Sequence, residues 1–456
     1  MNTLLPMLAA LALALAWPAA AAAPADADPR IQRLVAAVSP DRLQQLLTRL
    51  TAFGTRETLS DRAPATRGIT AAGDWIAEEL KRSSPKLQVS FDTHVISPAG
   101  RITRTTTLRN VMAILPGRSA RRIYISGHYD SLNLGPGVQL ALTTAAPGAR
   151  AENPQSQPQF DHDADAPGAN DDGSGTVLTM ELARVFAESG LDFDATLVFV
   201  CWAGEEQGLI GSTAHARDLA ANGVVVEAAL NSDIVGNVRG GDGRVDGTGV
   251  RVYSVGPEDS PSRALARYVR AAAAIYVPSH RVRLMAREDR FGRGSDHSAF
   301  TQSGFPAVVF REAAENFARQ HTADDTLAGV DIGYLAQNAR VNAAAAATLA
   351  LAPPVPKITG ERGAPLLSRD PSGYDASLRW TASPGAAGYR VYWRDTWTHD
   401  WQHRQDVGNV THFVLPGVSI DDFVFGVAAV GADGQESLVA SYEAGVRKPA
   451  AVTPVK

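Results

Sequence analysis

Residues 176–208 read TVLTMELARVFAESGLDFDATLVFVCWAGEEQG, and this stretch decides the fold class. Its first part, 176–188, carries apolar residues at helical spacing, which predicts a helix with apolar side chains available for burial against the rest of the protein. Its second part, 195–202, is a short continuous apolar run, which predicts a strand buried on both faces. A helix followed by such a strand is typical of an α/β protein with a parallel sheet.

The same alternation extends in both directions along the chain. Helical spacing recurs in residues 41–50, 69–80, 262–274 and 331–351, and another helix is expected beyond Ser212. Short apolar runs predict further strands at 110–115, 122–126, 224–230, 250–255 and 307–310. We therefore predict a mostly parallel sheet covered by helices on both faces, with ligands bound beyond the carboxyl ends of its strands.

Length and composition indicate a globular protein with more than one domain. The 456 residues exceed one ordinary core, so an enzyme-sized α/β domain plus a smaller domain is expected. Hydrophobic residues make up 45% and charged residues 20%, which argues against disorder. A net charge of -5 gives no reason to expect nucleic acid as a partner. The single cysteine, Cys201, lies in an apolar run and is expected in the core.

The first 25 residues resemble a signal peptide. The run from Leu4 to Ala16 is almost wholly apolar, and small residues suited to cleavage follow from Ala19 to Ala25. A membrane anchor is the alternative, but the run is shorter than the ~20 residues needed to span a bilayer. No Lys or Arg precedes Leu4, so the positive charge at this end rests on the terminal amine. We expect a secreted or periplasmic protein without stable membrane insertion.

Most of the candidate metal ligands follow predicted strands, His321 by a longer loop, whereas Asp171 lies in the block just before the predicted helix 176–188. The set consists of His128, Asp171, Glu205, Glu206, Asp233 and His321. Any one of them alone could be a surface or capping residue, but together they indicate a metal site. Zinc binds imidazole nitrogen and carboxylate oxygen, and a bridging carboxylate can hold two ions about 3.5–4 Å apart. Asp171 is the candidate bridge.

Two neighbours of these ligands are predicted to have other roles. Asp130 lies two residues beyond His128 in an extended segment, so it can orient the imidazole, although a turn-forming Asp is the alternative. Glu205 and Glu206 are adjacent and cannot share one role. One is expected to bind metal and the other to act as general base, and their order in the sequence does not assign them.

Five motifs in order resemble metallopeptidase family twenty-eight, over roughly residues 70–351. They are His128-Tyr129-Asp130-Ser131, Asn170-Asp171-Asp172-Gly173-Ser174-Gly175, Gly204-Glu205-Glu206-Gln207-Gly208, Asn231-Ser232-Asp233 and Ser295-Asp296-His297. The resemblance, which extends to secreted bacterial di-zinc aminopeptidases, implies a three-layer α/β/α sandwich. It implies that His128 and Asp233 bind one zinc ion, that Glu206 and His321 bind a second, that Asp171 bridges them and that Glu205 is the base.

The implied reaction is removal of an N-terminal residue, often a large apolar one, from peptides or proteins with a free N-terminus. Bacterial relatives often supply a Tyr to stabilise the oxyanion, but Gln320 and the stretch 291–294 occupy the two usual places. Arg293 is our candidate replacement, because its guanidinium is always charged. The Ser-Asp-His motif is not a metal-ligand motif of the family, so Asp296 and His297 are expected to support the substrate pocket.

A second domain is predicted after a stiff Pro-rich linker. The expected boundaries are 1–25 for the signal peptide, 26–352 for the zinc aminopeptidase domain, 353–356 for the linker, 357–447 for an all-β domain and 448–456 for a tail. Short alternating runs in the all-β domain resemble a fibronectin type III sandwich with Trp380 and Tyr389 in its core. Trp393, Trp397 and Trp401 form either an exposed patch for binding a polymer or protein, or part of the packing.

Three other functions compete with the aminopeptidase. A glutaminyl cyclase belongs to the same family, but that branch uses a single zinc ion and does not need His128. A carboxypeptidase would differ in pocket residues that the sequence does not identify. A catalytically inactive binding or adhesion protein is disfavoured, because every metal ligand and the base are present.

Overall fold

The computed structural model describes residues 27–60, 66–135, 138, 154–157, 159–371 and 373–442. The predicted signal peptide, the tail and much of the polar loop between 132 and 167 lie outside the described residues. Among the described helices, none combines the length and apolar character needed to cross a membrane.

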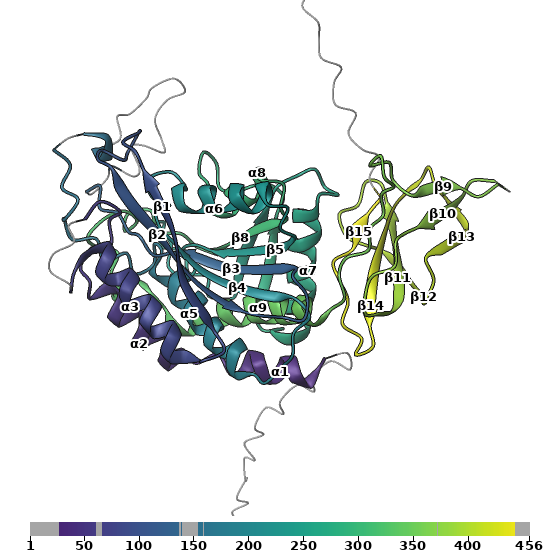
Figure 1. Ribbon diagram of the computed structural model, residues 1–456, viewed down its shortest axis with the longest axis horizontal. Helices are drawn as coiled ribbons and strands as arrows, with labels where there is room; N and C mark the ends of the chain where they lie inside the picture. The colour runs from purple at the N-terminus through teal and green to yellow at the C-terminus, as the bar shows by residue number, and fades with distance from the viewer. Residues whose placement is uncertain are drawn as a thin grey trace, which may run out of the picture.

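An eight-stranded mixed sheet forms the centre of the larger part of the molecule (Figure 1). Its strands are β1 (Gln88–Ile96), β2 (Thr106–Leu115), β3 (Arg122–His128), β4 (Thr196–Trp202), β5 (Val226–Ser232), β6 (Gly249–Ser254), β7 (Arg281–Met285) and β8 (Ala307–Glu312). They follow the order β1-β2-β4-β3-β5-β8-β6-β7, and the central run β4-β3-β5-β8 is parallel. All six predicted strands are confirmed. The two unpredicted strands, β1 and β7, are the partly exposed edges of the sheet, so their sequences lack a continuous apolar run.

Helices cover both faces of this sheet. One face carries α1 (Pro29–Ala36), α2 (Pro40–Thr51), α3 (Gly68–Ser83), α5 (Gly173–Glu188), α7 (Pro261–Tyr276) and α9 (Ile332–Leu351), and the other carries α6 (Ile210–Ala221) and α8 (His297–Gln302). Strand β4 contributes to the cores on both faces. Its residues Leu197, Phe199 and Cys201 pack in the core under the larger group of helices, and Val198, Val200 and Trp202 pack in the core under α6 and α8. The α/β prediction and the buried Cys201 are therefore confirmed.

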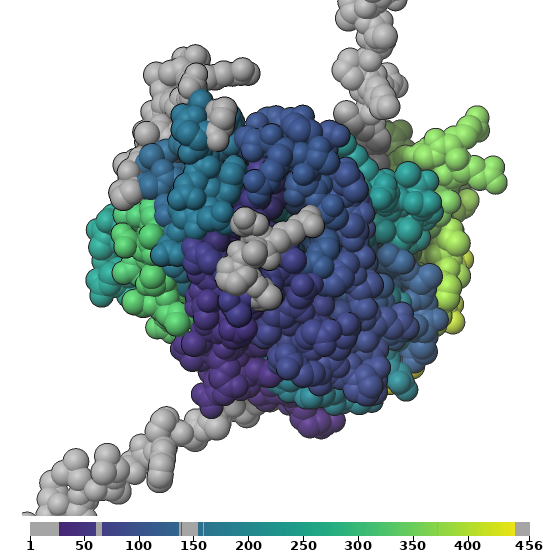
Figure 2. All heavy atoms as spheres, turned by 60° about the vertical axis from the view of Figure 1, so that its left-hand side comes forward, coloured from purple at the N-terminus to yellow at the C-terminus, as the bar shows by residue number. Residues whose placement is uncertain are grey.

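The N-terminal helices pack beside segments from much later in the chain. Helix α1 contacts α9, and α2 contacts both α5 and α9. Figure 2 shows this N-terminal part, purple to blue, on one face of the molecule next to teal and green segments. Two single-turn 3-10 helices, Pro154–Ser156 and Leu327–Gly329, also lie in the described part of the chain. The face that carries α2 and α5 is thus closed by contacts between distant parts of the chain.

The C-terminal part is all-β, as predicted. Its strands are β9 (Leu367–Arg369), β10 (Asp375–Arg379), β11 (Ala386–Asp395), β12 (His403–Gly408), β13 (His412–Ser419), β14 (Phe423–Gly431) and β15 (Ala440–Ser441). They form two antiparallel sheets, β13-β10-β9 and β12-β11-β14-β15. Trp380 and Tyr389 are buried together in the core, with ring centroids 5.3 Å apart, as the sequence predicted.

The three tryptophans near β11 do not share one environment. Trp401 lies with its ring 5.9 Å from the guanidinium carbon of Arg267, a residue of α7. It therefore belongs to the interface between the two parts of the chain. Trp393 stacks on His403, and Trp397 is the exposed member, at 76%. The packing interpretation holds for Trp401, and a binding role for Trp397 stays a prediction.

We expect Phe199→Ala to lower the free energy of unfolding by about 3–5 kcal/mol, because it opens a cavity at a fully buried position of the central strand β4. Urea unfolding monitored by tryptophan fluorescence measures this loss. Phe291→Ala is the matched control, since Phe291 is 87% exposed and its removal should change stability by at most about 0.5 kcal/mol. Equal losses in the two variants would contradict this packing.

Candidate metal centre

Five predicted ligands meet at the carboxyl edge of the sheet. His128 is the last residue of β3, and Asp233 directly follows β5. Asp171 lies just before α5, Glu206 lies four residues beyond β4, and His321 reaches the site from the loop after β8. Three groups have ligand atoms within 4.8 Å of one another, namely His128-Asp171-Asp233, His128-Glu205-Glu206 and Asp171-Glu206-His321.

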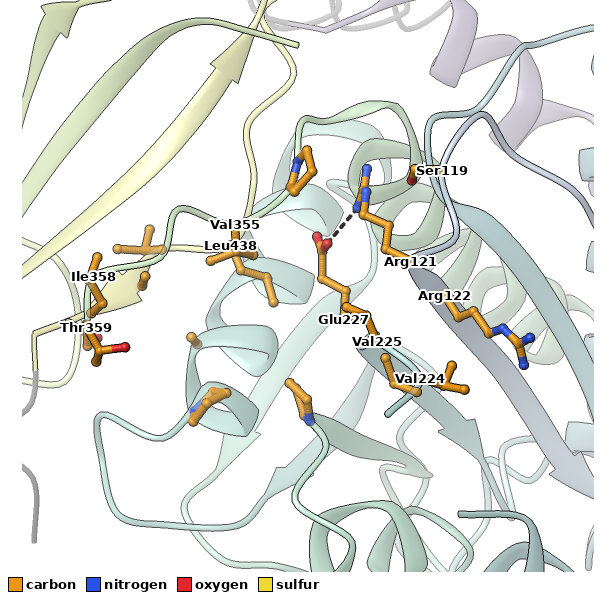
Figure 3. Close-up of a pocket in the computed structure, with 18 of the residues that line it drawn as sticks. Ser119, Arg121, Arg122, Val224, Val225, Glu227, Val355, Ile358, Thr359 and Leu438 are labelled. Carbon is orange, nitrogen blue, oxygen red and sulfur yellow. Dashed lines mark hydrogen bonds and ion pairs between the residues drawn. The ribbon is translucent and has the colours of Figure 1, made fainter. Parts of the chain in front are cut away.

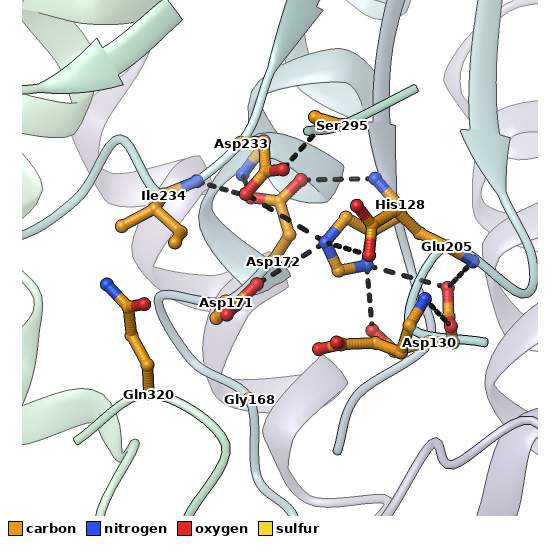
Figure 4. A network of polar contacts seen from close by, with 12 residues as sticks. His128, Asp130, Gly168, Asp171, Asp172, Glu205, Asp233, Ile234, Ser295 and Gln320 are labelled. Carbon is orange, nitrogen blue, oxygen red and sulfur yellow. Dashed lines mark hydrogen bonds and ion pairs between the residues drawn. The ribbon is translucent and has the colours of Figure 1, made fainter. Parts of the chain in front are cut away.

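The Asp171 carboxylate contacts the imidazoles of both His128 and His321, and Figure 4 shows it beside His128. Its Oδ1 is 3.3 Å from Nε2 of His128, and its Oδ2 is 3.1 Å from Nε2 of His321. Glu206 Oε2 lies 3.0 Å from the same nitrogen of His321, and Asp233 Oδ1 lies 3.9 Å from that of His128. The Asp171 carboxylate is therefore shared by two sets of ligands, one around His128 and one around His321. This is the arrangement that a pair of metal ions needs.

The charges of the site favour cations. Burial opposes protonation of His321, yet Glu206 and Asp171 raise its pKa to about 10. The second oxygen of Glu206, Oε1, is buried and has no hydrogen-bond partner among the described residues. Imidazole nitrogens and carboxylate oxygens are the ligands that zinc prefers in hydrolytic sites. The donor set therefore fits zinc.

Asp130 connects the two strand ends that carry ligands. Its carboxylate accepts hydrogen bonds from the backbone N–H groups of Glu205 and Glu206, at 3.2 and 3.1 Å, and from the hydroxyl of Thr58. The same carboxylate lies 3.5 Å from Nδ1 of His128, and the Asp130 carbonyl oxygen lies 3.1 Å from that nitrogen. Asp130 thus holds the imidazole and the glutamate turn in one arrangement.

The two adjacent glutamates differ in their surroundings. Glu206 is 4% exposed and contacts His321, whereas the side chain of Glu205 is 13% exposed. Glu205 Oε2 lies 4.0 Å from Nε2 of His128. Burial raises the pKa of Glu205 well above its usual range, opposed by His128 and reinforced by Glu206, Asp233 and Asp296. Glu205 is therefore the more exposed of the two glutamates.

Asp325 anchors the loop of Asp171 and has no role in our sequence predictions. Its carboxylate accepts hydrogen bonds from the backbone N–H of Asp171, at 2.8 Å, and from that of Asn170, at 3.0 Å. Its carbonyl oxygen accepts a third from Ala169. No feature of the sequence distinguishes it from the neighbouring Asp324, which is exposed.

Arg311 and Ser295 hold Asp233 from two sides. Arg311 Nη1 lies 2.5 Å from Asp233 Oδ1, and the Ser295 hydroxyl donates to Oδ2 at 2.5 Å. Asn231 donates in turn to the Ser295 oxygen, at 2.8 Å. The Ser-Asp-His motif therefore contributes its Ser to ligand positioning, a role that its sequence did not reveal.

Asp296 and His297, the other residues of that motif, are both buried. Burial raises the pKa of Asp296 to about 7, and the Asp296 charge acts on Glu205. His297 begins α8, and its Nε2 lies 2.9 Å from the Glu288 carbonyl oxygen. Their expected part in the substrate pocket stays a prediction.

Arg293, the candidate oxyanion residue, forms a loose ion pair. Its Nη1 lies 3.4 Å from Glu315 Oε2, and its guanidinium carbon lies 5.2 Å from the ring centroid of Phe317. Burial lowers the pKa of Arg293 to about 10, so it is cationic at neutral pH, and Asp171 is among the charges that act on it. The oxyanion role of Arg293 stays a prediction.

The sheet and the shared carboxylate define a candidate two-metal centre on an α/β scaffold. A family model described as Peptidase family M28 matches residues 110–346, and the chain belongs to this family of zinc metallopeptidases. A "Probable zinc metalloprotease" of Pyrenophora teres f. teres is 36% identical over 90% of this chain and 86% of its own length. A protein of the same description from Pyricularia oryzae is 38% identical over 90% and 84%. Both relatives are fungal, so they support the family and not the bacterial branch we expected.

Solved structures show a similar fold. The LapA aminopeptidase of Legionella pneumophila matches with a TM-score of 0.53 and 20% identity, over 70% of this chain and 74% of that one. LapB from the same organism also matches with a TM-score of 0.53, over 71% and 75%. At this identity the likeness concerns the fold alone, and it agrees with the mostly parallel sheet described above.

We expect Asp325→Asn to weaken zinc binding about 10–100-fold, because the amide keeps one acceptor oxygen and loses the charge that holds two backbone N–H groups. Competition with a fluorescent chelator measures the affinity. The neighbouring exposed residue supplies the control, Asp324→Asn, which should bind zinc as the unchanged protein does. Unaltered affinity in Asp325→Asn would show that the anchor is unimportant.

Proposed function

We propose that this chain is a di-zinc aminopeptidase that removes the N-terminal residue from peptides and proteins. The observation that carries the proposal is the Asp171 carboxylate, with one oxygen toward each of two imidazoles and an accessible glutamate beside them. His128 and Asp233 would hold one ion, Glu206 and His321 the other, and Asp171 both. When bound, the metals supply Lewis-acid polarisation of the scissile carbonyl and a more acidic water.

Glu205 is the proposed general base. It takes a proton from the attacking water and passes it to the departing amine, while its neighbour Glu206 stays deprotonated as a ligand. Asp130 positions both glutamates through their backbone N–H groups and contacts His128 as well. The burial of the site excludes bulk water and strengthens these interactions.

A free N-terminus is the expected requirement of the substrate, because an unprotonated amine is a nitrogen ligand that a zinc ion held at this site would bind, whereas an acetylated nitrogen is not. We expect a leucyl peptide with a free amine to be hydrolysed at least about 100-fold faster than its acetylated twin. Chromatography of the released amino acid measures both rates. Comparable hydrolysis of the capped peptide would refute the aminopeptidase while leaving a metallopeptidase possible. The preference for a large apolar first residue is tested by the same assay with other residues in that position.

The adjacent glutamates provide a matched pair of variants. We expect Glu205→Gln to lower kcat about 10²–10⁴-fold with normal zinc content, because the amide cannot accept the proton of water. Glu206→Gln should instead lower the zinc content, because its carboxylate contacts His321. Steady-state kinetics with metal analysis separates these effects. Loss of zinc in Glu205→Gln to the same extent would make the assignment of the base wrong.

Two further expectations stay proposals. Export to the periplasm or medium rests on residues 1–25, which lie outside the described residues. The fibronectin type III assignment of the C-terminal part is supported by its two antiparallel sheets and by the buried Trp380 and Tyr389. Expression of the full chain, followed by mass analysis of the protein recovered outside the cytoplasm, tests export. An uncleaved product confined to the cytoplasm would disprove it.

A further inference from the structure

An apolar cleft of about 880 Å³ lies between the sheet domain and the C-terminal β sheets (Figure 3). One wall is formed by the amino ends of β3, β5 and β8 and the start of α7, and the other by the segment after α9 and by β15. Val224, Val225, Val355 and Leu438 are among the apolar side chains that line it. Its volume and apolar lining are those of a ligand site at a domain interface.

This cleft is distinct from the metal centre. It lies at the amino ends of the strands, whereas His128 and Asp233 lie at or just beyond their carboxyl ends. A strand of seven residues such as β3 separates the two edges by roughly 20 Å. A ligand in the cleft therefore cannot touch the catalytic residues.

The two walls are held in place by polar contacts. The Tyr268 hydroxyl of α7 donates to the Glu436 carbonyl oxygen at 2.8 Å. Arg394 pairs with Asp259, and both Arg267 and Arg394 lie against the ring of Trp401. The cleft is consequently preformed, and an occupant does not have to order it.

Two residues of the lining each carry a buried polar atom that has no hydrogen-bond partner among the described residues. The atoms are Oε1 of Glu227 and Oγ of Ser441. Glu227 is only 8% exposed, and its other oxygen pairs with Arg121 at 2.8 Å, as Figure 3 shows. A buried carboxylate oxygen without a donor is costly, so the site favours an occupant that brings an N–H group or a cation.

Backbone groups provide a further means of recognition. Strand β15, the two-residue strand that includes Ser441, is the last strand of its sheet among the described residues, where it pairs with β14. It contacts α7 and so lies on the side of its sheet that faces the cleft (Figure 1). An edge strand beside apolar pockets is the arrangement that binds an extended peptide by strand addition.

We propose that this cleft is a peptide-binding exosite that takes an extended, apolar segment with one basic side chain directed at Glu227. The apolar lining accommodates the uncharged side chains, β15 offers backbone partners, and the unpaired oxygen of Glu227 selects the cation. The exosite would hold part of a polypeptide chain at a distance from the metal centre.

Fluorescence anisotropy with three labelled peptides tests the exosite. Each peptide has seven residues that alternate valine and threonine around a central lysine, glutamine or glutamate, and both ends are capped so that the N-terminus is blocked. We expect the lysine peptide to bind the full-length protein at least about tenfold more tightly than the glutamine peptide, and the glutamate peptide to bind most weakly. Equal affinities, or no binding at about 1 mM peptide, would overturn the proposal.

Two variants locate the binding. Glu227→Gln should abolish the preference for lysine over glutamine while the glutamine peptide binds as before, which also shows that the cleft is intact. Glu188→Gln, which alters another ion-paired glutamate, is the matched control and should keep the preference. Val225→Trp should weaken all three peptides at least about tenfold, because this 62% exposed side chain lines the cleft and a larger one fills it.

Hydrolysis of a dipeptide by these variants separates the exosite from the proposed catalytic function. All three should keep the rate of the unchanged protein, whether or not that rate reflects an aminopeptidase. Peptide binding that survives Val225→Trp would place the peptide elsewhere and overturn the proposal. Two other results would overturn the proposal in favour of a different occupant. Binding seen only after removal of residues 443–456 would show that the C-terminal tail fills the cleft. Self-association of the chain that Val225→Trp abolishes would show that a second copy of the chain fills it.

Discussion

The carboxylate of Asp171 between two imidazoles is the contact on which the arrangement of the site depends. Carboxylates buried this close together repel one another and lose their hydration, so positive charge must lie beside them. His128 and His321 provide part of it, and Arg311 neutralises Asp233 from the side of β8. The remaining excess of negative charge is what suits the site to metal ions.

Two kinds of support hold these ligands. His128 and Asp233 lie at the ends of buried parallel strands, so the register of the sheet sets their separation. Asp171 and His321 lie on loops, which need fastening by other residues. Asp325 binds the backbone of the Asp171 loop, and the His321 carbonyl oxygen accepts a hydrogen bond from Leu134. The rigid sheet and the fastened loops together produce one site.

Much of the scaffold follows from local pattern, and its exceptions have a common cause. Residues 110–115 and 195–202 are recognisable as strands because both faces are buried, whereas β1 and β7 lie at edges and show mixed burial. Among the site residues, the candidate ligands could be recognised by their chemical type, and most of them also by their place after strands. Asp325 was not, because Asp324 beside it has the same chemistry and only packing brings one of them to Asp171.

The sequence by itself determined the α/β class, the all-β C-terminal part and the six candidate residues of the metal site, because periodicity and side-chain chemistry are local properties. Tertiary structure alone decided that Glu206 contacts His321 while Glu205 stays accessible, and that both oxygens of Asp171 are used. It also decided that a cleft separates the two parts of the chain. These features depend on distances between residues far apart in the chain, which the packing of strands, helices and loops sets and no local pattern records.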